Sequence, residues 1–402
     1  MKQALESMLG TFREVFGGEP DLVASAPGRV NLIGEHTDYM GGLVMPVAID
    51  RQILFSIRSS PGEYVTGYST EFGERVRFRA GEFNPGHPNR WLRYVLGVLQ
   101  ELERSGIRPG GFEFCVAGNV PQGAGLSSSA ALEVAVARAV LDLIQHPLPG
   151  RDVALLCQRA ENGFVGMQCG IMDQYISAMG IADHALKIDC ANLEYEAVAA
   201  AVPGHTWLVI DSGKKRGLVD SEYNLRRTQC QEGLEWLRAR LPHLRRENAL
   251  RALSPEELAA ASAGMDPVLL RRIRHVVGEN ARVERACAAL RRGDLAALGE
   301  NLSASHRSLR DDYEVSCPEL DLLVDILHRT PGTIGARLTG AGFGGCVIAL
   351  IRDGSVETAV AAVRREYPVR FPSACPVSAW PIRLADGAKT IYSSAPSLKR
   401  GA

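Results

Sequence analysis

The strongest chemical signal in the sequence is the run VPQGAGLSSSAAL at residues 120–132, which lies between a predicted strand and a predicted helix. Glycines and other small residues let backbone amides approach an anion. A helix that begins near Ser127 would point its N-terminal amides at the same anion. The serine hydroxyls could contact phosphate oxygens or a magnesium ion. A loop that only caps the helix is the alternative, and it stays open on these residues alone.

A second polar cluster is GRVNLIGEHTDY at residues 28–39, where Arg29, Glu35, His36 and Asp38 lie close together. Carboxylates that accept hydrogen bonds from neighbouring hydroxyls are a natural way to hold a sugar. A metal site is a rival because histidine and carboxylates are common metal ligands, although no HExxH spacing supports it. A polar surface turn is the third interpretation.

A third cluster, GMQCGIMDQYISAMG at residues 166–180, places Asp173 among glycines and apolar residues. This setting suits a carboxylate in a partly buried pocket, although many single aspartates are helix caps or surface residues. The sequence contains no GxxxxGK[ST] loop and no HRD or DFG motif, which disfavours P-loop and protein-kinase chemistry. GAGFGG at residues 340–345 formally matches GxGxxG. It precedes a predicted strand rather than a helix, so a dinucleotide site is not expected.

Composition limits the remaining classes of function. At 402 residues the chain is long enough for two or three domains. Its 45 basic and 46 acidic residues nearly cancel, so we expect no nucleic-acid partner. No apolar run reaches membrane-span length, and the N-terminal residues lack the apolar block of a signal peptide. The nine scattered cysteines contain no CxxC pair, which indicates reduced thiols and a cytoplasmic protein.

Strands and helices are predicted in both halves of the chain, which favours an α+β protein. Strands are expected within residues 20–60. Alternation of Phe112, Phe114 and Val116 with polar residues predicts a half-buried strand. The Ala-rich stretch 198–205 could be a domain junction. Helices are predicted from near Ser127 through Leu143, from an N-cap at Asp152 to about 165, and over 219–240, 268–292, 294–310, 318–329 and 357–367.

The three clusters, in this order and at these intervals, resemble the GHMP small-molecule kinases, and GRVNLIGEHTDY resembles the galactokinase family signature almost residue for residue. SEYNLRR (221–227), RHVVGENARV (274–283) and LTGAGFGGC (338–346) extend the resemblance over roughly residues 20–385. It implies a domain 1–200 like domain 2 of ribosomal protein S5 and a ferredoxin-like domain 201–402, with the active site in the cleft between them. The implied reaction is ATP-dependent phosphorylation of D-galactose at C1, which gives galactose 1-phosphate and ADP.

The resemblance also implies roles for single residues. Asp173 would be the base and Arg29 its cationic neighbour. The sugar would be held by Glu35, His36, Thr37, Asp38, Gly170 and Tyr223. ATP would be held by Ser69, Gly123, Ala124, Gly125, Leu126, Ser127, Ser128 and Ser129. Mg²⁺ would be held by Ser129 and Glu161.

The partners expected are galactose and ATP, with no nucleic acid or membrane, and nothing in the sequence demands more than a monomer. An N-acetylgalactosamine or arabinose kinase, or a sugar-responsive regulator without turnover, would share most of these motifs. The segment 211–224 departs from the family pattern through the paired Lys214 and Lys215, which puts details of specificity in doubt.

Overall fold

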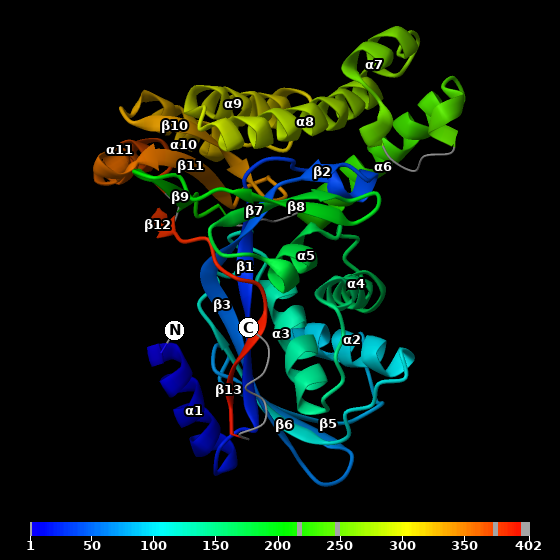
Figure 1. Cartoon of the computed structure of the whole chain (residues 1–402), viewed down its shortest axis with the longest axis vertical. Coiled ribbons are helices and arrows are strands. Elements are labelled where there is room, and N and C mark those ends of the chain that lie inside the picture. The colour runs from blue at the N-terminus through cyan, green and yellow to red at the C-terminus, as the bar shows by residue number, and fades with distance from the viewer. Residues whose placement is uncertain (1, 215–218, 246–249, 373–376, 395–402) are drawn as a thin grey trace.

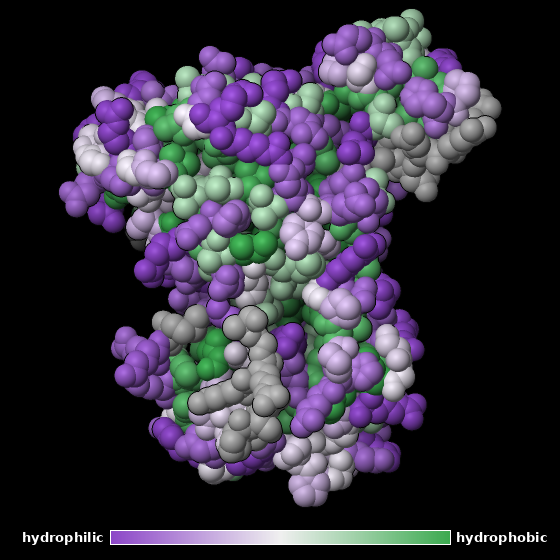
Figure 2. All heavy atoms as spheres, in the orientation of Figure 1, coloured by the Kyte–Doolittle hydropathy of each residue, from purple (hydrophilic) through white to green (hydrophobic). Residues whose placement is uncertain are grey.

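The computed structural model describes residues 2–214, 219–245, 250–372 and 377–394. Figure 1 shows two halves joined in the middle, each built on its own sheet, with a narrower waist between them in the space-filling view of Figure 2. The face seen in Figure 2 is mostly hydrophilic. Among the described helices, none is long and apolar enough to cross a membrane.

The lower half is built on a six-stranded sheet in which every neighbouring pair is antiparallel except β4 and β6. Its strands, in spatial order, are β13 (Lys389–Ser393), β1 (Leu22–Asn31), β3 (Pro46–Ser59), β6 (Phe112–Gly118), β4 (Tyr64–Ser69) and β5 (Glu74–Arg79). The predicted strand at 112–116 is present. Cys115 is buried as well as Phe112 and Phe114, because α1 (Lys2–Phe16) covers the second face of the sheet through Met8 and Phe12.

Helices cover the other face of this sheet (Figure 1). They are α2 (Arg90–Arg104), α3 (Ser128–Leu143), α4 (Gly150–Ala160) and α5 (Met172–Met179). The helix predicted over 152–165 is α4 followed by a single π-helical turn, Glu161–Val165. Its N-cap is Pro149 rather than the expected Asp152. Asp152 lies in the first turn, where its negative charge interacts favourably with the positive end of the helix dipole.

The upper half contains a four-stranded antiparallel sheet, and a small three-stranded sheet lies near the junction. The larger sheet has the spatial order β10 (Thr333–Thr339), β11 (Cys346–Arg352), β9 (His205–Asp211) and β12 (Ser378–Ile382). With helices after β9 and β11, this is the split βαββαβ arrangement of a ferredoxin-like fold. The small sheet is β2 (Leu43–Val44), β7 (His184–Asp189) and β8 (Glu194–Ala199).

The helices predicted in the second half are all found, within three residues at each end. They are α6 (Val219–Arg238), α8 (Pro267–Arg292), α9 (Leu295–Asp311), α10 (Pro318–Arg329) and α11 (Val356–Arg370), and α7 (Pro255–Ala261) is an additional helix. The turn 200–204 separates the small sheet from β9, and the boundary at 200/201 stays a prediction. One correction concerns the end of the chain. β13 pairs with β1, so the last described strand completes the lower sheet and not the expected 201–402 unit.

A shared apolar core joins the halves. Val30 and Val47 of the lower sheet pack in one cluster with Val209 and Ile348 of the upper sheet. This continuity holds the loops that follow β1 and β10 against each other. The α+β, two-part architecture expected from the sequence is therefore present.

Candidate active site

A cavity of about 610 Å³ lies where loops of the two halves meet. We call residues 34–43 the sugar loop and residues 123–129 the phosphate loop, after their expected roles. The structure brings most of the predicted residues together around this cavity. Those that line it are Arg29, Glu35, His36, Asp38, Gly123, Gly125, Leu126, Ser127, Ser128, Ser129, Glu161, Gly170, Asp173 and Tyr223.

Three predicted residues do not line the cavity. Thr37 is fully buried, and its hydroxyl donates to the carbonyl oxygens of Gly34 (3.0 Å) and Leu43 (2.7 Å), so it closes the sugar loop on itself. Ala124 is 2 % exposed and packs in the shared core. Ser69, also 2 % exposed, is the last residue of β4. The side chains of Thr37 and Ala124 therefore have structural roles, and the ligand contacts expected for Thr37, Ala124 and Ser69 stay predictions.

The phosphate loop turns through left-handed backbone conformations before α3 begins at Ser128. Gly123 has φ +73°, Gly125 φ +82° and Ser127 φ +57°. Such a turn at the N-terminus of a helix presents backbone amides to one point, which suits a phosphate. The loop is fastened to β1, because the Arg29 amide donates to the Leu126 carbonyl at 3.0 Å. A side chain at Gly28 would meet that carbonyl at 2.7 Å, so the close approach requires glycine.

Arg29 and Asp173 form a two-point ion pair at the cavity wall. Arg29 Nε lies 2.6 Å from Asp173 Oδ1, and Nη2 lies 2.7 Å from Oδ2. Ser127 Oγ donates to Oδ2, and Arg29 Nη1 donates to the Gly125 carbonyl at 2.6 Å. Burial acts to lower the pKa of Arg29, but the carboxylate of Asp173 raises it above its ordinary value. The predicted base, its cation and the phosphate loop are thus one connected unit.

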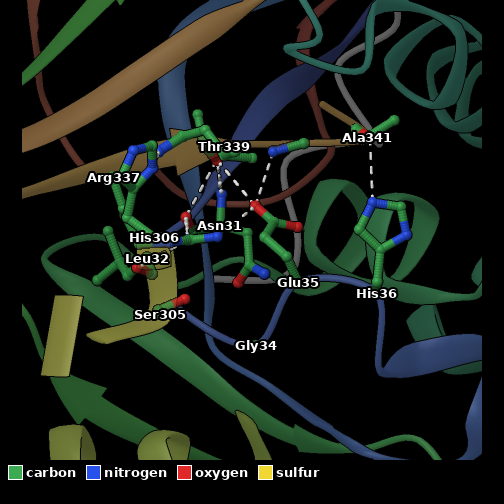
Figure 3. Close-up of polar contacts among 12 residues, drawn as sticks. Asn31, Leu32, Gly34, Glu35, His36, Ser305, His306, Arg337, Thr339 and Ala341 are labelled. Carbon is green, nitrogen blue, oxygen red and sulfur yellow. Dashed lines mark hydrogen bonds and ion pairs between the residues drawn. The ribbon is translucent and has the colours of Figure 1, made fainter. Parts of the chain in front are cut away.

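Glu35 ties the sugar loop to the glycine motif that follows β10 (Figure 3). Its Oε1 accepts from the Gly340 amide at 2.7 Å and lies 3.2 Å from Nη2 of the fully buried Arg337. Thr339 Oγ1 also contacts this oxygen, at 3.2 Å. No donor among the described residues is assigned to Oε2, so that oxygen is available to a ligand in the cavity.

His36 is held through both ring nitrogens. Nε2 lies 3.0 Å from the Ala341 carbonyl (Figure 3), and Nδ1 lies 2.9 Å from the Tyr39 hydroxyl. Because a carbonyl can only accept, Nε2 carries the proton and Nδ1 accepts from Tyr39. Burial lowers the pKa of His36 to about 3, so the ring is neutral near pH 7. Because both ring nitrogens are already hydrogen-bonded, His36 can contact a sugar only through the face of its ring.

Asp38 faces Asp173 across the cavity and rests against Gly170. Its Oδ1 accepts from the Tyr39 amide at 3.0 Å, and no side chain would fit at Gly170 beside this carboxylate. Burial, followed by the negative charge of Asp173, raises the pKa of Asp38 to about 6. Tyr223, from α6 of the upper half, packs its ring 5.4 Å from that of His36, measured between centroids. The sugar side of the cavity thus combines carboxylates with an aromatic wall.

Glu161 and Ser129 lie together at the phosphate side. The Ser129 side chain is close enough to act on the pKa of Glu161, and Gln174 Nε2 donates to Glu161 Oε2 at 2.5 Å. Burial and then the charge of Asp173 raise the pKa of Glu161 to about 7. Within the described residues there is no cluster of three or more His, Cys, Asp or Glu side chains arranged for a metal. Mg²⁺ often takes only one or two protein ligands beside substrate phosphates and water, so a carboxylate and a hydroxyl at this position fit it.

Other cavity-lining residues were missed by sequence reasoning. They are Arg90, Met167, Cys169, Met172, Ser221, Gly340 and Ala341. Gly340 and Ala341 belong to a glycine motif whose contact with Glu35 spans about three hundred residues of sequence. Arg90 has no local motif that could have revealed it. Of the two unusual lysines, Lys214 pairs with Glu319 at 2.9 Å, and Lys215 lies outside the described residues.

Comparison with known proteins agrees with this geometry. Residues 10–59 match the galactokinase galactose-binding signature, residues 93–181 the GHMP kinase N-terminal domain, and residues 286–369 the GHMP kinase C-terminal domain. The crystal structure of Lactococcus lactis galactokinase complexed with galactose is 35% identical, with a TM-score of 0.91 over 96% of this chain and 100% of that one.

More distant structures share the fold. The mevalonate kinase of Methanococcus jannaschii is 19% identical, with a TM-score of 0.64 over 91% of this chain and 99% of that chain. A D-glycero-D-manno-heptose 1-phosphate kinase is 14% identical, with a TM-score of 0.62 over 92% of this chain and 100% of that chain. The two-domain GHMP kinase fold expected from the sequence is confirmed, and the chain is an ATP-dependent sugar kinase that belongs to the galactokinase family.

Proposed function

We propose that this chain transfers the γ-phosphoryl group of ATP to the C1 hydroxyl of D-galactose, giving galactose 1-phosphate and ADP. The observation that carries the proposal is the Arg29–Asp173–Ser127 unit, which joins the sugar side of one cavity to its phosphate side. The similarity to a galactokinase crystallised with galactose supports galactose as the acceptor.

In the reaction the C1 oxygen attacks the γ-phosphorus. The bond between that phosphorus and the β,γ-bridging oxygen breaks, and ADP leaves with the electron pair. The proton of the C1 hydroxyl passes to Asp173. Oδ2 already accepts from Ser127 and Arg29, whereas Oδ1 accepts one hydrogen bond, so Oδ1 is the better placed proton acceptor.

Charge stabilisation comes from groups set in advance around the phosphates. The amides of the phosphate loop face the triphosphate, and Arg29 is positioned to stabilise charge on the transferring group. Ser129 and Glu161 would hold Mg²⁺, which when bound neutralises charge on the β- and γ-phosphates. On the sugar side, Glu35, Asp38 and Tyr223 would bind hydroxyl groups, with the backbone of Gly170 beside them.

The proposal is tested by ADP release with a panel of sugars: galactose, N-acetylgalactosamine, arabinose and glucose. We expect galactose to give the highest kcat/KM. A higher value for another sugar would assign a different substrate to the same chemistry. Sugar binding without ADP release from any member would indicate a regulator instead.

We further propose that the protein acts as a monomer in the cytoplasm, with domains that meet near residue 200. Eight cysteines within the described residues are free thiols, which is usual in a reducing compartment. Light scattering during size-exclusion chromatography tests the monomer: a mass near 43.5 kDa is expected, and twice that mass would contradict it.

A further inference from the structure

Helix α8 of the upper half contacts the sugar loop of the lower half through buried polar side chains. Glu279 Oε1 accepts from the Gly34 amide at 3.0 Å, and Asn280 Oδ1 accepts from the Leu43 amide at 2.8 Å. His275 Nε2 lies 3.0 Å from the Glu35 carbonyl, so Nε2 is the protonated nitrogen. Two adjacent helix residues therefore hold both ends of the loop that carries the sugar-binding carboxylates.

The sugar loop fits closely against this helix. A side chain at Gly34, whose φ is +98°, would meet the Leu43 carbonyl at 2.6 Å. A side chain at Gly42 would meet Asn280 Oδ1, also at 2.6 Å. Neither Gly34 nor Gly42 therefore has room for a side chain. Exposure points the same way, because Glu279 is fully buried and Asn280 is 6 % exposed.

The Glu279 carboxylate is itself fixed by two further side-chain contacts. Glu279 also accepts from Ser305 Oγ at 2.6 Å and pairs with Arg282 Nε at 2.6 Å. Although burial acts to raise the pKa of Glu279, the positive charge of Arg282 and further neighbours lower it to about 2. Glu279 is therefore an ionised acceptor at neutral pH, and hydrogen bonds to charged groups are stronger than neutral ones.

We propose that Glu279 and Asn280 are positioning residues that fix the sugar loop, so that α8 of the upper half sets the sugar affinity of carboxylates on the lower half. This inference rests on the proposed function for its kinetic consequence, because it assumes that Glu35 and Asp38 bind the sugar. It explains why two polar residues, Glu279 and Asn280, are buried side by side on α8.

The test is Asn280→Ala, which removes the acceptor of the Leu43 amide. We expect the galactose KM to rise about tenfold, since a buried amide left without its partner costs ~1.4 kcal/mol or more. The ATP KM should stay within twofold.

Asn301→Ala is a matched control. Asn301 is 8 % exposed and accepts from Arg285 of α8 at 3.0 Å, but it does not touch the sugar loop. This variant should lower the melting temperature and leave the galactose KM within twofold. The proposal is overturned if Asn301→Ala raises the galactose KM as much as Asn280→Ala, or if Asn280→Ala changes it less than twofold.

Hydrogen exchange separates this inference from the proposed function. In the protein without ligands, Asn280→Ala should accelerate amide exchange in the peptide that contains Leu43, whereas Asn301→Ala should not. If the wild-type chain failed to phosphorylate galactose, the proposed function would fail, and the exchange rates would still decide the role of α8. Unchanged exchange at Leu43 would reject that role.

Discussion

Gly170→Ala is the substitution whose effect follows most directly from the geometry of the sugar side. The backbone of Gly170 is not in the left-handed region, so the only obstacle to alanine at this position is the space that its Cβ requires. That Cβ would lie 2.7 Å from Asp38 Oδ1 and closer still to Cγ and Oδ2. Because carbon atoms do not approach oxygen this closely, Asp38 or the Gly170 backbone must move away.

The expected cost is that of the hydrogen bonds Asp38 makes to the sugar. Hydrogen bonds to a charged group contribute ~1.5–3 kcal/mol, which corresponds to a rise in galactose KM of roughly 10-fold to 150-fold. The ATP KM should change less than twofold, since the atoms that the added Cβ would meet first belong to Asp38 of the sugar loop. Initial rates of ADP release with each substrate varied in turn give both constants.

Gly163→Ala is the matched control, because Gly163 lies in the same segment and an added Cβ there would have nothing within 4 Å. It should leave both constants near the wild-type values. If Gly170→Ala left the galactose KM within twofold, Asp38 would not be a sugar ligand in the way we describe. An equal rise in both constants would point to general damage of the cavity.

Further predictions concern the base, the pH dependence and the metal. Asp173→Asn removes the proton acceptor but keeps the shape, so kcat should fall at least about a hundredfold while calorimetry still detects sugar binding; a kcat within threefold of wild type would contradict the assignment. Because the raised pKa of Asp38 is about 6, kcat/KM for galactose should fall as the pH drops from 7 to 5 and this carboxylate becomes protonated. A flat profile over that range would argue against an ionised Asp38 at the sugar. Ser129→Ala and Glu161→Ala should each raise the Mg²⁺ concentration needed for half-maximal rate, with partial recovery at high Mg²⁺, and superimposable Mg²⁺ titrations would reject the metal assignment.

Much of the fold followed from the sequence because local patterns were strong. The sequence placed α8, α9 and α10 within one residue at each end, and alternation placed β6. β13 could not be assigned to its sheet in this way. It pairs with β1 across more than 360 residues of sequence, and such a contact depends on the assembled core rather than on local pattern.

The candidate site was predictable to a similar extent. Glycines and serines identified the phosphate loop, since close approach of backbone to an anion restricts residue type directly. The direction of single side chains was not predictable. Thr37 lies between two cavity residues in the sequence, yet its hydroxyl bonds to backbone inside the loop. Both ring nitrogens of His36 are hydrogen-bonded, one to Tyr39 and the other to Ala341, which lies in a distant segment of the sequence.

The role of α8 was hidden for the same reason. In sequence, Glu279 and Asn280 resemble packing or ion-pairing positions of an amphipathic helix. Only the folded chain places their oxygens at the amides of Gly34 and Leu43. Polar residues that act on backbone from another half of the molecule leave no local spacing by which to find them.

The central claim is that this cavity directs phosphoryl transfer to the C1 oxygen of galactose. The most direct measurement is ³¹P–¹H correlation NMR of the product formed from galactose, ATP and Mg²⁺ by the wild-type chain. We predict one new phosphate monoester signal that correlates with the anomeric proton of galactose and that accumulates at least about a hundredfold more slowly with Asp173→Asn. A phosphate that correlates with a proton at another carbon, or ADP formation without any sugar phosphate, would contradict the account.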